Sequence, residues 1–337
     1  MRFYTNNKQR NKQNCKHPPH KSIQIAIASF LFAAPTQALF AEILPSEFKN
    51  NLVYLTPTLT DGTKIRFYTD TGGGWNVISQ ELFDKYQWPS IEKASKRGPV
   101  KLSSMPSFTK EKSIPKGGLN NFMEGQLFIA PSNKIDEDKL GYDGFLGGRW
   151  HAEKIININY PAQQFAVLDQ LPKSSAKMEV LNLGFQKDQH GSYTMAFPRM
   201  PVTVDGQSLD LLLDTGAQAT LSSEAKSIID IAGNTMAASF MVASVFDQWR
   251  AKHPEWKYIE AGDAYIKEAM IQVPEIKIAT FSVGPVWFAR RADHNFHEHM
   301  SAMMDKKIDG ALGGSAFQYL NMIIDYPAEK LYLEKVN

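Results

Sequence analysis

The chain is poor in cysteine, in long apolar segments and in excess charge, and each of these shortages excludes a class of protein. Its 337 residues include one cysteine, Cys15, so disulfides cannot hold the fold together. The most apolar segment, residues 23–34, is too short to cross a bilayer. The formal charge is only +2, from 37 basic and 35 acidic residues. We therefore expect neither a disulfide scaffold, nor a membrane-spanning protein, nor a nucleic-acid-binding one.

The basic residues are unevenly placed, which predicts an export signal. Six cations and no acidic residue precede the apolar run IQIAIASFLFAA at residues 23–34, and small residues follow it. We expect residues 1–41 to be a signal peptide, with Ala38 or Ala41 as the last residue removed. The remaining chain then carries a charge of (37 − 6) − 35 = −4 and no cysteine. Export without cysteine is typical of a bacterial periplasm, so a periplasmic or secreted protein is expected.

No metal signature is present, although one segment is rich in histidine. The sequence DHNFHEHM contains His294, His297 and His299, but the zinc spacing that begins at His297 requires a histidine where Ser301 stands. We expect this segment to be a solvated loop. The protein is expected to use no metal and no cofactor.

What the sequence does contain is the tripeptide Asp-Thr-Gly, twice, at residues 70–72 and 214–216. An Asp-Gly turn signal precedes each copy by nine positions. Farther downstream, YDGFLGGRWHAEKIININYPA from Tyr142 matches IDGALGGSAFQYLNMIIDYPA from Ile308. The same landmarks in the same order predict an internal duplication in which each half supplies one half-site.

Proline and serine near residues 170–177 divide the chain after the signal into an N-terminal lobe, 42–172, and a C-terminal lobe, 173–337. In both, short runs rich in Val, Ile, Phe, Tyr and Leu lie between turn signals, which predicts mainly antiparallel β-structure. Few helices are expected. Short ones should begin at Ser79 and Ser223, acting as N-caps, and an amphipathic one should lie within residues 239–256.

Each motif aspartate follows an apolar strand, so its carboxylate is expected at a sharp turn beside buried backbone. Two such lobes placed face to face would bring Asp70 and Asp214 close together. Carboxylates at that separation cannot both ionise, so they share one proton and provide a general base and a general acid in one site. Asp143 and Asp309 are alternative acids, although Asp-Gly is more typical of a turn.

These motifs resemble those of the aspartic peptidases. The segment LLLDTGAQATLS is similar to the retropepsin signature, whereas two halves in one chain resemble the pepsins. The family's apolar-apolar-glycine element, which threads behind each catalytic strand, is matched by residues 145–147 (FLG) and 311–313 (ALG). The resemblance implies a mainly β, bilobal pepsin-like (acid protease) fold, with two homologous β-barrel-like lobes and few short helices.

The resemblance also implies an activity, that of an aspartic endopeptidase acting on a peptide or protein substrate. Asp70 and Asp214 would activate one water for attack on the peptide bond, without a metal or a covalent intermediate. Thr71 and Thr215 would bond across the lobe interface and hold the carboxylates coplanar. Because one chain carries both aspartates, a monomer is expected.

Other residues next to the aspartates have implied or candidate roles. Gly72 and Gly216 would orient the carboxylates through their backbone N–H groups, and Trp75 is a candidate to line the substrate pocket. Pepsins usually have serine after Asp-Thr-Gly. This chain has Gly73 and Ala217 there, so the first loop is expected to be looser than in pepsins.

The candidate for a flap over the site is the hairpin-like segment at residues 115–121 (PKGGLNN). The weak flap signal and Gly73 leave open an alternative function, a catalytically silent peptide-binding protein of the same fold. A β-rich structural protein with accidental motifs is a further alternative. Retention of both aspartates favours the enzyme, because a binding module gains little from two carboxylates forced together.

Overall fold

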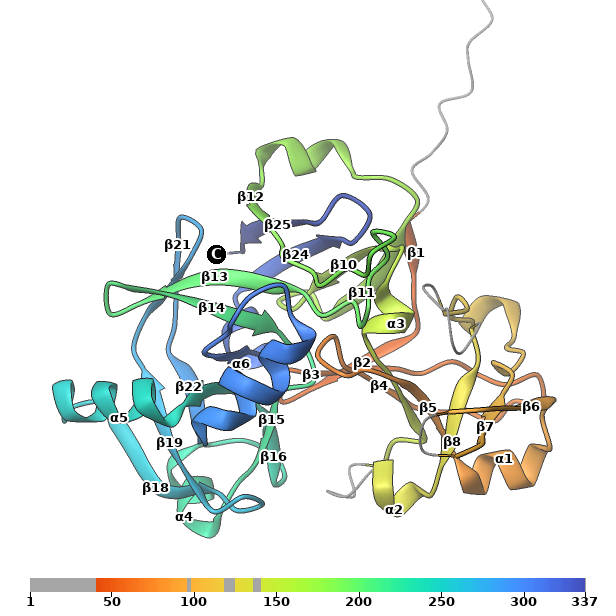
Figure 1. Ribbon diagram of the computed structural model, residues 1–337, viewed down its shortest axis with the longest axis horizontal. Helices are drawn as coiled ribbons and strands as arrows, with labels where there is room; N and C mark the ends of the chain where they lie inside the picture. Colours follow the sequence, from red (N-terminus) through yellow and green to blue (C-terminus); the bar gives the residue numbers. More distant parts are fainter. Residues whose placement is uncertain (1–40, 96–97, 118–124, 136–140, 337) are drawn as a thin grey trace, which may run out of the picture. The chain divides into compact units, whose positions relative to one another are not determined.

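Strands carry most of the regular structure, as the apolar runs predict. The computed structural model describes residues 41–95, 98–117, 125–135 and 141–336, and Figure 1 labels its elements. This part of the chain contains three large sheets, one two-stranded sheet and only short helices. The mainly β prediction is confirmed. Apart from Ala41, the expected signal peptide lies outside the described residues.

The first Asp-Thr-Gly motif belongs to an eight-stranded sheet. Its strand β4 runs parallel to β9, with Thr69 opposite Leu146. Apolar side chains of this sheet, among them Val53 on β3 and Phe67 on β4, are fully buried. In spatial order the strands are β2 (Ser46–Lys49), β3 (Leu52–Leu55), β4 (Phe67–Thr69), β9 (Gly144–Leu146), β5 (Asn76–Ser79), β8 (Leu127–Ala130), β7 (Val100–Ser103) and β6 (Ser90–Lys93).

The second motif belongs to a nine-stranded sheet, in which β14 runs parallel to β23 with Leu213 opposite Leu312. In spatial order the strands are β18 (Lys257–Asp263), β19 (Glu268–Val273), β22 (Val286–Arg291), β17 (Ser239–Val242), β23 (Gly310–Leu312), β14 (Gln207–Leu213), β13 (Arg199–Val204), β20 (Ile276–Ile278) and β21 (Phe281–Val283). A separate pair is formed by β15 (Gln218–Thr220) and β16 (Thr235–Ala237).

The two sheets repeat one arrangement around their motifs. In each, the strand that ends at the motif aspartate lies parallel to the strand of the apolar-apolar-glycine element. A third strand then lies antiparallel on the far side of that element, β5 in the first sheet and β17 in the second. The sequence repeat therefore corresponds to a repeated structural unit.

A six-stranded sheet takes strands from both halves of the chain (Figure 1). At its centre the equivalent strands β10 and β24 pair antiparallel, with Asn157 opposite Ile323. Because this sheet spans the expected boundary at residue 172, that boundary stays a prediction. In spatial order the strands are β1 (Ala41–Ile43), β11 (Gln164–Leu168), β10 (Ile155–Asn159), β24 (Leu320–Asp325), β25 (Lys330–Lys335) and β12 (Glu179–Asn182).

Two helices begin close to the predicted serines. Helix α1 (Gln80–Tyr86) is capped by Ser79, whose hydroxyl accepts the Leu82 N–H at 3.2 Å. Helix α4 (Ser223–Ile228) is capped by Ser222, whose hydroxyl accepts the Ala225 N–H at 3.1 Å. The prediction of Ser223 as the cap was wrong by one residue. The cap is the last residue with an extended backbone, and that residue is Ser222.

The amphipathic helix predicted within residues 239–256 is shorter than expected. Helix α5 spans Ala243–Lys252 and buries Val245, Phe246 and Trp249 as its spacing predicts. Residues 239–242 instead form β17, because β22 and β23 offer backbone partners on both of its sides. The other helical segments are α2 (Ser132–Ile135), α3 (Gly148–His151), α6 (Gly314–Phe317), η1 (Lys110–Lys112), η2 (Lys173–Lys177), η3 (Asn295–Met300) and η4 (Ser301–Met303). Within the described ranges, no helix has the length and apolar character needed to span a membrane.

Candidate active site

The two Asp-Thr-Gly loops meet through their threonines, both of which are fully buried. The Thr71 hydroxyl donates to the Leu213 carbonyl at 2.7 Å and accepts the Thr215 N–H at 3.0 Å. The Thr215 hydroxyl donates to the Thr69 carbonyl at 3.1 Å and accepts the Thr71 N–H at 3.2 Å. Each loop thus satisfies buried polar groups of the other, which fixes the separation of the aspartates that precede the threonines.

Asp70 and Asp214 are brought together, and their carboxyl groups are hydrogen-bonded to each other. Desolvation raises the pKa of Asp70, an effect opposed by hydrogen bonds from Asp214 and from the N–H groups of Gly73 and Gly72. Desolvation and the neighbouring Asp70 charge hold the pKa of Asp214 well above its ordinary value. Two carboxyl groups held this close share one proton, so the pair carries a single negative charge.

The motif glycines lie against the carboxyl group of the opposite loop. A Cβ atom on Gly72 would lie 2.6 Å from Asp214 Cγ, and one on Gly216 would lie 2.5 Å from Asp70 Cγ. The Gly216 N–H donates to Asp214 Oδ1 at 2.9 Å, and the Gly72 N–H bonds to both aspartates. Only glycine permits such an approach of backbone to carboxylate.

Gly73 corrects the expectation of a looser first loop. A Cβ atom at this position would lie 2.7 Å from Asp70 Cγ, so the absence of a side chain lets the backbone pack directly on the carboxylate. Its N–H hydrogen-bonds to Asp70. Its carbonyl accepts the Gly148 N–H at 2.7 Å. The loop is held on both sides of this glycine.

The apolar-apolar-glycine elements support both loops from behind. Asp70 N–H donates to the Leu146 carbonyl at 3.0 Å, and Asp214 N–H donates to the Leu312 carbonyl at 2.9 Å. The glycine that ends each element is then held by a side chain. Asn76 accepts from Gly147 N–H at 3.1 Å, and Ser239 accepts from Gly313 N–H at 3.1 Å.

The sequence did not predict the roles of Asn76 and Ser239, because these residues occupy different positions in the two repeats. Asn76 lies on β5, close after its motif, whereas Ser239 lies on β17 after an inserted pair of strands and a helix. Aligning the repeats therefore gives no signal for either residue. Tyr68 was also missed. It is nearly buried, and its hydroxyl donates to the Gly216 carbonyl at 2.8 Å.

Trp75 lies beside the first loop, and its side chain is accessible. The residue is 42% exposed, and its ring centre lies 6.4 Å from that of Phe128. An accessible indole five positions after Asp70 suits the predicted contact with substrate. The candidate flap is only partly described. The structure describes its residues 115–117, and the rest of the segment lies outside the described residues. The Pro115 carbonyl accepts the Trp150 indole N–H at 2.9 Å.

A layer of buried aromatic rings contains the tyrosines of the repeated Tyr-Pro-Ala segments. The hydroxyl groups of Tyr160 and Tyr326 are buried, and no described residue hydrogen-bonds to them; the same holds for His151 Nε2. The His151 ring stacks on Tyr326 with centres 6.4 Å apart, and at the equivalent place Phe317 packs against Tyr160 at 6.0 Å. Burial lowers the pKa of His151 to about 3, so this imidazole is neutral in the folded protein.

The remaining candidate residues have structural surroundings. Asp143 accepts the Arg66 backbone N–H at 2.8 Å, which fits the turn role. Asp309 lies 3.1 Å from His297 Nε2. The histidine segment forms the turn η3 instead of the expected loop. Among the described residues, no three histidine, cysteine or acidic side chains gather as they would around a metal.

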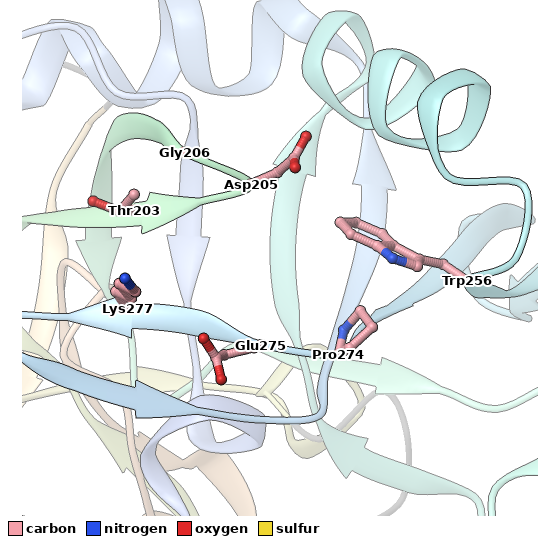
Figure 2. Close-up of a pocket in the computed structure, with 7 residues that line it drawn as sticks. All are labelled: Thr203, Asp205, Gly206, Trp256, Pro274, Glu275 and Lys277. Carbon is pink, nitrogen blue, oxygen red and sulfur yellow. The ribbon is translucent and has the colours of Figure 1, made fainter.

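A hollow with a volume of about 320 Å³ lies in the second half, near the turn between β13 and β14 (Figure 2). Two of its lining carboxylates already have partners. Asp205 pairs with Lys252 and His253, and Glu275 accepts the Ser282 hydroxyl at 2.9 Å. Its lining contains no motif residue and consists of Thr203, Asp205, Gly206, Trp256, Pro274, Glu275 and Lys277. This hollow is distinct from the aspartate pair.

No protein-family profile matches the sequence, and no curated protein is similar to it. Among solved structures, the chain is similar to conglutin gamma, a basic 7S globulin from lupine seeds. The identity is 9% and the TM-score 0.47, over 89% of this chain and 96% of that protein. A likeness of this size says nothing about activity, so the functional reasoning rests on the geometry of the site.

Proposed function

We propose that this chain is an aspartic endopeptidase, a hydrolase that cleaves peptide bonds with a water activated between Asp70 and Asp214. The observation that carries the proposal is the hydrogen-bonded pair of carboxyl groups, one from each repeat. The crossed bonds of Thr71 and Thr215 hold the two loops in register. Two buried acids held so close differ in proton affinity, and this difference divides the base and acid roles between them.

In this mechanism Asp70 is the base. It takes a proton from the water as the water oxygen attacks the carbonyl carbon of the scissile bond. Asp214 gives its proton to the carbonyl oxygen, so the intermediate is a neutral gem-diol. On collapse, Asp70 protonates the leaving amine and one hydroxyl proton of the gem-diol returns to Asp214. The pair ends with one proton, as it began, and neither a metal nor a covalent intermediate takes part.

We further propose that the protein acts as a monomer outside the cytoplasm. The monomer is supported by the contribution of one aspartate from each half of a single chain. The location is supported by the basic residues and the apolar run before residue 42.

The proposal is tested by digesting a proteome-derived peptide library with the wild type, Asp70→Asn and Asp214→Asn. Each variant should lose about 10³-fold or more in kcat/KM, because each removes one proton-transfer group. Both should stay folded, since an amide keeps the shape of the carboxyl group. A chelator should leave wild-type activity unchanged. Appreciable cleavage by either purified variant would contradict the pair. Peptide binding without cleavage by the wild type would favour the catalytically silent peptide-binding protein.

A further inference from the structure

A cation that no described carboxylate neutralises lies beside the first motif loop. Arg149 belongs to α3, and its guanidinium carbon lies 5.4 Å from the centre of the Trp75 ring. Its Nη2 donates to the Thr194 carbonyl at 3.0 Å and lies 3.6 Å from Met195 Sδ. Its Nε is buried and has no hydrogen-bond partner among the described residues. In the described part of the chain, no aspartate or glutamate pairs with it.

Most other described arginines are neutralised by an acid. Four of them form ion pairs, namely Arg66 with Glu47, Arg199 with Asp210 and Asp305, Arg290 with Asp247 and Glu268, and Arg291 with Asp263. Arg250 instead donates to the Pro254 carbonyl and lies over the Tyr258 ring. Burial lowers the pKa of Arg149. A partly desolvated guanidinium without a counter-charge is half of an ion pair, and an incoming carboxylate would complete it.

The position of Arg149 places this cation next to the candidate site. The neighbouring Gly148 N–H donates to the Gly73 carbonyl at 2.7 Å, and Gly73 packs directly on the Asp70 carboxyl group. Two backbone contacts therefore separate the arginine from the catalytic carboxylate. An extended peptide advances about 3.3 Å per residue, so a substrate that runs from Asp70 past Trp75 would bring a side chain near its scissile bond to Arg149.

The second repeat shows that the fold itself does not require an arginine here. The residue equivalent to Arg149 is Ser315, which is 1% exposed. The Ser315 hydroxyl bonds to the Ser239 hydroxyl at 3.1 Å and donates to the Trp287 carbonyl at 3.2 Å. A small buried serine builds the same short helix in one repeat, whereas the other repeat places a partly accessible cation at that point.

We propose that Arg149 and Trp75 form a subsite for an acidic side chain, so that the preferred substrates are peptides with Asp or Glu within about three residues of the scissile bond. The carboxylate would accept hydrogen bonds from the guanidinium, and the methylene groups of the side chain would lie against the indole. This inference rests on the proposed function and names its substrate class.

The test compares wild type, Arg149→Met and the control Arg250→Met on paired peptides that differ only by Glu or Gln at each position near the cleaved bond. At one position, the wild type should prefer Glu over Gln by about 10-fold or more in kcat/KM, as a charge-assisted hydrogen bond predicts. Arg149→Met should remove this preference by losing activity on the Glu peptide while keeping activity on the Gln peptide. Arg250→Met should retain the preference. Equal cleavage of Glu and Gln peptides by the wild type would overturn the subsite.

Measurements of peptide binding distinguish an incorrect subsite from an incorrect proposed function. Asp214→Asn and the double variant Asp214→Asn/Arg149→Met are titrated with the same Glu and Gln peptides by calorimetry. Tighter binding of the Glu peptide that disappears in the double variant supports the subsite, even when the wild type cleaves nothing. Binding that ignores the Glu-to-Gln change contradicts the subsite and leaves the hydrolase standing on the cleavage result alone.

Discussion

The two halves of the molecule hold their aspartates in the same way but surround them differently. The threonine bonds are reciprocal, and each apolar-apolar-glycine element lies behind its own loop. Among the equivalent positions that differ are Gly73 and Ala217, Arg149 and Ser315, and His151 and Phe317. What the halves share fixes the geometry of the pair. The backbone groups that bond to the two carboxyl groups also differ between the halves.

This inequality has a chemical consequence. Two identical surroundings would leave the proton equally placed, whereas here Asp70 receives N–H groups from both Gly72 and Gly73. Asp214 receives N–H groups from Gly216 and Gly72, and the charge of Asp70 raises its pKa. The duplicated fold therefore supplies the symmetry that brings the acids together, while the backbone N–H groups around the two carboxyl groups differ.

The largest difference in activity between matched substitutions in the two halves is expected at Gly73. In Gly73→Ala, a Cβ atom 2.7 Å from Asp70 Cγ would displace the carboxylate. We expect kcat/KM to fall by about 100-fold or more, because a misplacement of about 1 Å has that effect on catalysis. The matched exchange Ala217→Gly should cost only about 1 kcal/mol of stability and leave most activity. Steady-state kinetics with thermal unfolding as a control measures both. Equal activity losses in the two variants would contradict the difference between the loops.

The threonines should show the opposite result, equal effects in both halves. Thr71→Val and Thr215→Val each keep the side-chain shape but leave one buried carbonyl and one buried N–H of the other loop unpaired. We expect each to lower the free energy of unfolding by about 2–5 kcal/mol. Thr71→Ser and Thr215→Ser keep the hydroxyl and should lose far less. Chemical denaturation measures these differences, and a large effect in only one half would show that the bonds do not act reciprocally.

The last expected effect concerns His151 and appears only in acid. Burial lowers the pKa of His151 from 6.5 to about 3 in the folded protein, so below pH 6.5 the unfolded chain binds a proton that the folded chain excludes. Stability is therefore lost as the pH falls from about 6.5 toward 3, by about 1.4 kcal/mol per unit at most. In His151→Phe, which places the second repeat's residue in the first, this loss should disappear.

Unfolding free energies of wild type and His151→Phe measured across that pH range test the prediction. Their difference should move in favour of the variant as the pH falls, whatever its value at neutral pH. Phe317→Leu changes packing at the equivalent site without adding or removing a titrating group, so its difference from wild type should not depend on pH. A His151→Phe difference that stays constant would show that the imidazole is protonated in the folded protein.

Much of the architecture followed from local patterns. Short apolar runs between turn signals predicted the strands, because alternation and length are properties of the segment itself. The repeated landmarks predicted a repeated unit, which is present as two parallel strand pairs behind two loops. The local pattern predicted the wrong element where pairing with neighbouring strands decided the backbone conformation. Residues 239–242 have helical spacing, but their backbone groups are paired by β22 and β23.

The sequence by itself determined which aspartates, threonines and glycines belong together, because the two motifs repeat with their flanking landmarks. Only the tertiary structure decided the differences between the repeats, since each depends on atoms that are distant along the chain. Asn76 and Ser239 support equivalent glycines from unrelated positions, and Gly73 matters through its approach to Asp70. Arg149 is unpaired only because no described carboxylate reaches it. Spacing records a duplication, but burial, close approach and missing counter-charges exist only once the chain has folded.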